Sequence, residues 1–211
     1  MPEKAKIIIN NKTYEYPVIE GTDGVKSNDI TTFRSDSGGC LVYDQGFGNV
    51  ASCHSAITYL DGEKGILRYR GYPIEEIAEK ATFVETAYLL IHGELPTREQ
   101  LRAYSAAFTR HANLHEDMKA FFLGYPASGH PMAMLSAMVC ALSAYYPELV
   151  KPNPTDDEIE TTSIELLAKV RTIAACTYKK RVGEPFMYAR EDLEYMANFL
   201  HMMFSTPTHE Y

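Results

Sequence analysis

The sequence predicts a mainly α-helical protein, a multi-helical domain preceded by a small β-rich region at the amino terminus. Two observations support this fold class. In the first part of the chain, short apolar runs alternate with residues typical of turns and loops, which indicates strands and connections. After residue 73, apolar residues recur at spacings of three and four, and helix-capping pairs precede several of these segments. We therefore expect a β-rich region over residues 1–55 and a helical domain portion over residues 56–211.

The amino-terminal region begins with a predicted hairpin. Lys6–Ile9 and Thr13–Val18 flank an Asn-Asn pair, and asparagine tolerates the positive φ that a tight turn needs. The connection Gly21–Gly39 is rich in Ser, Asp, Thr and Gly, so it is expected to be irregular. Leu41–Tyr43 is expected to form another short strand.

A second hairpin is predicted where the two regions meet, in the stretch ITYLDGEKGILRYRGYPIEEIAE. The period of two in its second strand places Arg68 and Arg70 on one face. We assign both arginines to local hydrogen bonds rather than to substrate contacts. Pro73 suits the first position of the helix that follows.

From there onward we expect helices. The Thr82–Glu85, Thr97–Gln100 and Thr155–Glu158 pairs match the capping box. The predicted helices are Phe83–His92, Thr97 to about Ala112, Leu114–Leu123, Pro131 to about Tyr146, Thr155 toward Lys180, and Glu191–Phe204. The Pro131–Tyr146 helix is apolar nearly all round and must therefore be covered on every side. Burial within one domain and burial against a second subunit both explain this pattern, and we predict self-association through this helix.

Composition excludes several classes of function. The net charge of −8 and the pI near 5.4 argue against a nucleic-acid partner. The most apolar run, Met132–Tyr146, is shorter than the roughly 18 residues that a membrane span requires. The stretch MPEKAKIIINN lacks the apolar core of a secretion signal, and the four cysteines show no C-x-x-C spacing. We expect a cytoplasmic protein without a membrane partner.

Three motifs suggest chemistry, and each has a simpler interpretation. Gly46–Ala51 matches a dinucleotide fingerprint, but a strand follows it rather than the required helix, so we expect a loop. His111 and His115 could present two zinc ligands, but no third ligand is placed, and a surface pair is favoured. His130 precedes Pro131 and is expected to cap the helix. The residues therefore give no catalytic group, no cofactor-binding group and no metal site.

Several long motifs resemble the citrate synthase family. They are the ITYLDGEKGILRYRGYPIEEIAE stretch, ETAYLLIHGELPT, the helix after His130-Pro131-Met132, and NFLHMMF. The similarity runs from about Lys6 to Tyr211 and corresponds to the amino-terminal half of the family's chain, which implies an incomplete citrate-synthase-like large domain. The β-rich first part resembles the hexameric type of Gram-negative bacteria.

The resemblance implies condensation of acetyl-CoA with oxaloacetate and water, giving citrate and CoA in the tricarboxylic acid cycle. The family's catalytic aspartate and histidines come later in its chain, so catalytic residues are expected beyond residue 211, and this segment alone is expected to be inactive. The resemblance also implies a homo-oligomer, a dimer or a hexamer. Two alternatives remain open: 2-methylcitrate synthase, which shares the fold, and a non-catalytic helical or nucleotide-binding regulatory module.

Some members of the hexameric type are inhibited by NADH at an allosteric site. Arg110, His111, Tyr146 and Lys169 fall on matching positions, so the resemblance implies that these residues could bind NADH. Two positions depart from the family's pattern. Glu165 stands where an arginine is expected, and Thr208 stands where a reactive cysteine is found. A carboxylate repels phosphate, so the first departure argues against strong NADH inhibition.

Overall fold

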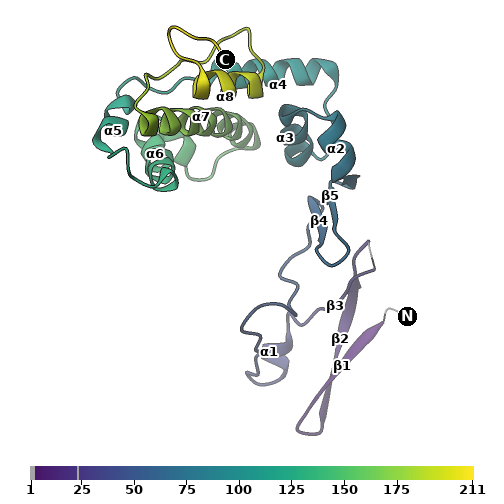
Figure 1. The fold of residues 1–211 in the computed structure, drawn as a ribbon. Helices are drawn as coiled ribbons and strands as arrows, with labels where there is room; N and C mark the ends of the chain where they lie inside the picture. The colour runs from purple at the N-terminus through teal and green to yellow at the C-terminus, as the bar shows by residue number, and fades with distance from the viewer. Residues whose placement is uncertain (1–2, 23) are drawn as a thin grey trace. The chain divides into compact units, whose positions relative to one another are not determined.

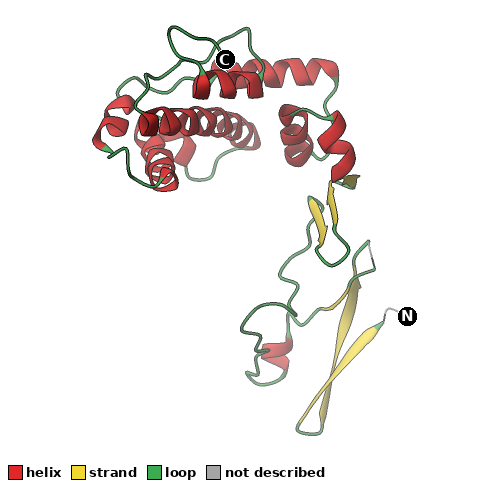
Figure 2. Ribbon diagram, in the orientation of Figure 1, coloured by secondary structure: helices red, strands yellow, loops and turns green. Residues whose placement is uncertain are grey.

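The structure is a computed structural model that describes residues 3–22 and 24–211 and divides into two compact units, Met1–Ala56 and Ile57–Tyr211. Residues 1–2 of the amino-terminal stretch and residue 23 of the Gly21–Gly39 connection lie outside the described residues. The first unit contains a sheet and a short helix, whereas the second begins with a small sheet and is otherwise mostly helical (Figure 2). The predicted fold class, mainly α-helical with a small β-rich amino-terminal region, is confirmed.

The first unit is built on an antiparallel sheet in the order β1-β2-β3. Its strands are β1 (Lys4–Ile9), β2 (Lys12–Glu20) and β3 (Lys26–Asn28). Asn10 and Asn11, which join β1 to β2, have φ values of 51° and 64°, the left-handed region that a tight hairpin turn requires. The register pairs Ile7 with Tyr14, and the predicted first hairpin is therefore confirmed.

Two expectations for the first unit are wrong. The Gly21–Gly39 connection contains β3 and the short helix α1 (Phe33–Asp36), whose Phe33 ring packs edge-on against Tyr16 at a centroid distance of 6.0 Å. Leu41–Tyr43 is not a strand, and the exposed fractions of Leu41 and Tyr43 are 72% and 84%. An apolar run forms a strand when another strand pairs with it, and among the described residues this run has no such partner.

The second hairpin opens the second unit and is formed by β4 (Thr58–Asp61) and β5 (Ile66–Tyr69), with β6 (Tyr72–Pro73) beside β5. Arg70 lies in the turn between β5 and β6 with φ of 50°, so it leaves the strand and does not share a strand face with Arg68. Its Nη2 donates a hydrogen bond of 2.7 Å to the carbonyl of Leu90 in the last turn of α3 (Phe83–His92). The shared face was therefore a wrong prediction, whereas the local hydrogen bond of Arg70 is confirmed.

Three helices of the second unit begin where the capping pairs predicted. Thr82, Thr97 and Thr155 each form a complete capping box. The Lys151 ammonium and the Thr155 amide lower the pKa of Glu158, the third residue of the helix that Thr155 caps, to about 2. The remaining helices are α2 (Ile74–Lys80), α4 (Arg98–Arg110), α5 (Met118–Gly124), α6 (Pro131–Tyr145), the 3-10 turn η1 (Pro147–Val150), α7 (Asp156–Val182) and α8 (Tyr195–Phe204).

Two helices start later than predicted. The segment expected to be helical from Leu114 has no regular structure at residues 114–115 and a turn at 116–117 before α5 begins at Met118, and α8 begins at Tyr195 rather than at Glu191. The apolar period continued through residues that belong to connections. Periodicity therefore located these helices but not their first residues.

Helix α7 is the centre of the second unit. It packs against α4, α5, α6 and α8, and Figure 1 shows it between α6 and α8. On one side its Ile173 and Cys176 join a core with Phe122, Met138 and Leu142. On another side Ile164 and Ala168 join a core that includes Tyr88, Tyr104 and Phe108.

The second of these cores is largely aromatic. Phe83 stacks on Tyr195 at 4.5 Å, and Tyr195 meets the edge of Phe108 at 5.1 Å. Phe108 then contacts Tyr104 at 5.1 Å, and Tyr104 contacts Tyr88 at 5.3 Å. Stacked and edge-on ring pairs contribute about 0.5–1.5 kcal/mol each beyond the burial of their area. This continuous series of rings joins α3, α4 and the start of α8.

Helix α6 is covered on one side. Met134, Met138 and Leu142 are buried, but Met132, Ser136 and Cys140 on the opposite face are exposed, Met132 by 61%. Residues 3–22 and 24–211 therefore do not cover this helix all round, so burial within this part of the domain does not explain its apolar pattern. In the part of the chain that the structure describes, none of the helices is long and apolar enough to span a membrane.

Candidate functional site

Three of the four residues that the resemblance matched to an NADH site lie together. The Nζ of Lys169 is 3.8 Å from the centre of the Tyr146 ring, and it donates hydrogen bonds to the carbonyl of His111 at 3.3 Å and to that of Asn113 at 3.1 Å. Arg110 is exposed at the end of α4, and its side chain makes no hydrogen bond or ion pair with the described residues. The structure thus brings together Lys169, His111 and Tyr146 but leaves Arg110 outside this cluster.

The geometry follows from how α4 ends. The last carbonyls of a helix, and those of the turn beyond it, have no partner within the helix and must find donors elsewhere. Lys169 supplies donors to two carbonyls after Arg110, and the hydroxyl of Thr172 donates to the carbonyl of Ala112 at 2.6 Å. Both side chains come from α7, one helical turn apart. They fasten the turn after α4 to the central helix.

Glu165 completes the cluster electrostatically. Its Oε1 is 3.3 Å from the Nζ of Lys169, one turn along α7, and 3.6 Å from Nδ1 of His111. Glu165 is 5% exposed and Lys169 is 2% exposed. An ammonium has three donors, and here they face a carboxylate and two carbonyls while the ring of Tyr146 lies against the charge. The cation is therefore satisfied by the protein itself.

The other motifs behave mostly as their simpler interpretations predicted. Helix α4 ends at Arg110, so His111 and His115 are not on one helix face, and Nδ1 of His115 accepts a hydrogen bond from the amide of Asp117. Within residues 3–22 and 24–211, no three His, Cys, Asp or Glu side chains gather as a metal site. Nδ1 of His130 accepts the amide of Met132 at 3.2 Å, so the predicted cap is confirmed. Gly46–Ala51 is a loop, also as predicted.

Buried polar groups on α7 were missed by the sequence patterns. Lys179 is fully buried and donates to the carboxylate of Glu184 at 2.5 Å and to the carbonyl of Ser205 at 2.6 Å. Arg171 is 6% exposed, stacks on Tyr195 and donates to the Tyr195 carbonyl at 3.0 Å. Among the described residues, Nε and Nη2 of Arg171 have no hydrogen-bond partner. Burial lowers the pKa of Arg171.

Among the described residues, the two groups whose pKa is raised to about 12 do not form an acid–base pair. Burial raises the pKa of Tyr104 to about 12 and that of the Cys176 thiol to about 12. These shifts keep both groups protonated and unreactive, and the two side chains belong to different cores. The described groups thus offer a packed frame rather than a general base.

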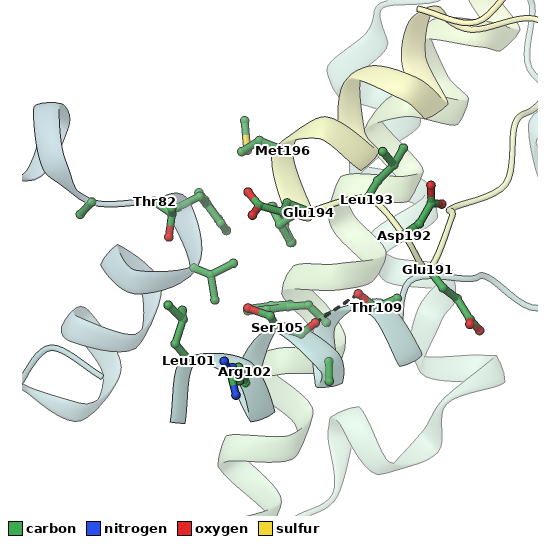
Figure 3. A pocket seen from close by; sticks show the side chains of 16 residues that line it. Thr82, Leu101, Arg102, Ser105, Thr109, Glu191, Asp192, Leu193, Glu194 and Met196 are labelled. Carbon is green, nitrogen blue, oxygen red and sulfur yellow. Dashed lines mark hydrogen bonds between the residues drawn. The ribbon is translucent and has the colours of Figure 1, made fainter. Parts of the chain in front are cut away.

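An open pocket of about 700 Å³ lies between the start of α3, helix α4 and the segment that leads into α8 (Figure 3). Its floor is apolar and aromatic, and Glu191, Asp192 and Glu194 line it from the α8 side. Arg190 holds the pKa of Asp192 below its usual value through a bidentate pair. The lining includes no histidine, so this pocket lacks the usual proton-transfer group.

The fold and the cluster define a helical protein whose buried charges serve its own structure. The family described as "Citrate synthase, C-terminal domain" matches residues 46–211. Citrate synthase 1 of Mycobacterium tuberculosis is 47% identical over 192 residues, which cover 91% of this chain and 43% of that protein. The chain therefore belongs to the citrate synthase family, and it spans less than half the length of this curated relative.

Solved structures agree with this membership. The citrate synthase of Pyrobaculum aerophilum has a TM-score of 0.68 and 32% identity, covering 90% of this chain and 44% of its own. That of Thermotoga maritima has a TM-score of 0.66 and 31% identity, covering 77% and 42%. The Thermoplasma acidophilum enzyme, in a ternary complex with carboxymethyl coenzyme A and oxaloacetate, has a TM-score of 0.70 and 27% identity, covering 77% and 42%.

A double-mutant cycle tests whether Glu165 and Lys169 stabilise the fold as a pair. Glu165→Gln and Lys169→Met should each lower the free energy of unfolding by about 3 kcal/mol, because each leaves a buried charge without its counter-charge. The double variant should lose less than the sum of the two by about 1 kcal/mol or more. Urea unfolding followed by circular dichroism measures this. Glu160→Gln, which removes a half-exposed partner of His92, is the control and should cost under about 1 kcal/mol. Additive losses from the two buried substitutions would contradict the pairing.

Proposed function

We propose that this chain is the amino-terminal part of a citrate synthase, which condenses acetyl-CoA with oxaloacetate and water to give citrate and CoA. The observation that carries the proposal is the 47% identity over 192 residues to citrate synthase 1 of Mycobacterium tuberculosis. The Thermoplasma acidophilum neighbour supports the same substrates, because that enzyme is bound to a coenzyme A derivative and oxaloacetate.

The chemistry explains what this chain contributes and what it lacks. The methyl group of a thioester is a weak acid, so its deprotonation needs a carboxylate base and a donor that stabilises the forming enolate oxygen. In the described chain the buried carboxylate of Glu165 is already paired with the ammonium of Lys169. We therefore propose that the base and the donors lie in polypeptide beyond residue 211. This chain would supply the rigid helical wall against which they are positioned.

Two alternatives are less well supported. The names of the relatives are those of citrate synthases, which does not favour 2-methylcitrate synthase. A non-catalytic nucleotide-binding module would need a free cationic site, whereas Lys169 is buried against Glu165. We keep both as outcomes of the test that follows.

The activity prediction compares the longer polypeptide with this chain. The full-length protein should release CoA thiol from acetyl-CoA when oxaloacetate is present, and omission of oxaloacetate is the control. Propionyl-CoA should react at least about tenfold more slowly, the discrimination that one extra methylene allows. The isolated 211-residue chain should release no thiol above background. An active isolated chain would disprove the proposed division of roles. A preference for propionyl-CoA would favour 2-methylcitrate synthase, and no thiol release by the full-length protein with either thioester would favour the non-catalytic module.

We also propose that the longer protein is a cytoplasmic homo-oligomer of the hexameric, Gram-negative type, and that α6 forms one of its interfaces. The exposed face of α6 carries Met132, Ser136 and Cys140, four residues apart, with Ala133 beside them. Small residues let two helices approach closely, and a helix can pair with its own copy across a two-fold axis. The buried face, with Met134 and Met138, already belongs to the core of its own subunit.

A charge on the exposed face of α6 should therefore break the oligomer. Ser136→Glu should lower the molar mass measured by light scattering, because each two-fold contact would bury two carboxylates without partners. Ala103→Glu, the same charge on an exposed position of α4, is the matched control and should leave the mass unchanged. The wild-type mass separates a dimer from a hexamer. An unchanged mass for Ser136→Glu would exclude this face as an interface.

For regulation, we propose that Arg110, His111, Tyr146 and Lys169 give at most weak NADH inhibition. The ammonium of Lys169 is already paired with Glu165, and the carboxylate of Glu165 would repel a phosphate at this place. Thr208 lies in the terminal segment, in a turn closed by a bridge between Thr206 and His209. A hydroxyl at this position does not supply the reactive thiol that the family's pattern implies there.

Removing the charge of Glu165 should strengthen inhibition of the full-length enzyme. Glu165→Gln is expected to lower the NADH concentration that halves the rate by about tenfold, which corresponds to about 1.4 kcal/mol of lost repulsion. Steady-state rates at fixed acetyl-CoA measure this, at a temperature where the variant keeps its helical spectrum. Glu160→Gln is the control. Strong inhibition of the wild-type enzyme by NADH would show that the pairing with Glu165 does not block the site.

A further inference from the structure

The floor of the open pocket beside α8 is apolar and partly exposed to solvent. Phe83 and Tyr195 stack there, and Phe108 lies next to Tyr195. Phe83 is 41% exposed, and Met196 on the rim is 47% exposed. Burial of such apolar area is worth about 25 cal/mol per Å², so a matching apolar surface would be held here. The shape and the floor point to an occupant with apolar side chains.

The charged side chains around the pocket indicate which charge the occupant should carry. Figure 3 shows the carboxylate of Glu194 on the side of the pocket that faces Thr82. Among the described residues, Glu194 and Glu191 have no ion-pair partner, whereas Asp192 is already bound by Arg190. Arg102 supplies a positive charge from α4. The two carboxylates outweigh it, which favours a cationic side chain near Glu194.

We propose that the pocket docks a segment of the longer polypeptide that carries apolar side chains for the aromatic floor and a Lys or Arg for Glu194. This inference rests on the proposed function, because the relatives that share this fold are more than twice as long as the part matched here. The docked segment would cover Phe83 and Met196 and give Glu194 its counter-charge. It would also fix the segment 191–196, from which α8 begins.

Cysteine labelling of the full-length protein tests this. Ala106→Cys places a thiol in the pocket, and Ala103→Cys places one on the same helix outside it; both positions are exposed in the described chain. Cys40, Cys53 and Cys140 are replaced by serine, and Cys176 is buried. The thiol at position 106 should react with a maleimide about tenfold more slowly than the thiol at position 103, because it reacts only when the segment detaches. Adding Glu194→Lys should bring the two rates together.

Equal rates in the parent variants would show an open pocket and overturn the proposal. Protection of the thiol at position 106 that grows with protein concentration would mean that a second copy fills the pocket, which also overturns it. Protection that survives Glu194→Lys would overturn the role of the cation. CoA release by the same variants distinguishes failure of this inference from failure of the proposed function. An active protein with an open pocket refutes the docked segment and leaves the proposed function standing.

Discussion

Cationic side chains that bind the open carbonyls at helix C-termini are the interaction on which the helical unit depends. Arg70 donates to Leu90 in the last turn of α3, and Lys169 donates to the carbonyls just after α4. Lys179 donates to Ser205, the cap residue of α8. Carbonyls at these ends have no partner within their own helix, and the helix dipole adds a partial negative charge there. A cation supplied by another element answers both needs.

This arrangement explains how α7 can be buried and charged at once. A charge removed from water is costly unless it is paired and hydrogen-bonded. Lys169 and Lys179 each meet one carboxylate and at least one carbonyl, so their burial is compensated. Each of the carbonyl contacts joins residues more than twenty positions apart in the sequence, as for Lys169 and His111 or Lys179 and Ser205. The buried charged residues of α7 therefore connect segments that are distant in the sequence, which a helix face exposed to solvent could not do.

The sequence predicted local structure better than it predicted these ties. Capping boxes at Thr82, Thr97 and Thr155 indicated helix starts correctly because the signal is complete within four residues. The predicted strand at Leu41–Tyr43 was wrong because a strand needs a partner strand, which an alternating pattern in the sequence does not reveal. The Lys179-Lys180-Arg181 run lies in the last turn of α7, and Lys179 is fully buried there. Its environment is set by Glu184 and Ser205, and nothing in the run itself distinguishes Lys179 from its neighbours.

The same physical constraint bears on function. Acetyl-CoA and oxaloacetate, the substrates that we propose for the longer protein, are anionic, so an enzyme that binds them must present cations with free donors. Lys169 and Lys179 already donate to carbonyls and carboxylates of this chain, and Arg171 is turned inward against Tyr195. Placing such a cation in an anion site would release a helix end that it now holds. A helical wall built in this way gains rigidity, and these three cations are not available for binding an anion, which agrees with the proposal that other polypeptide supplies the groups that recognise substrate.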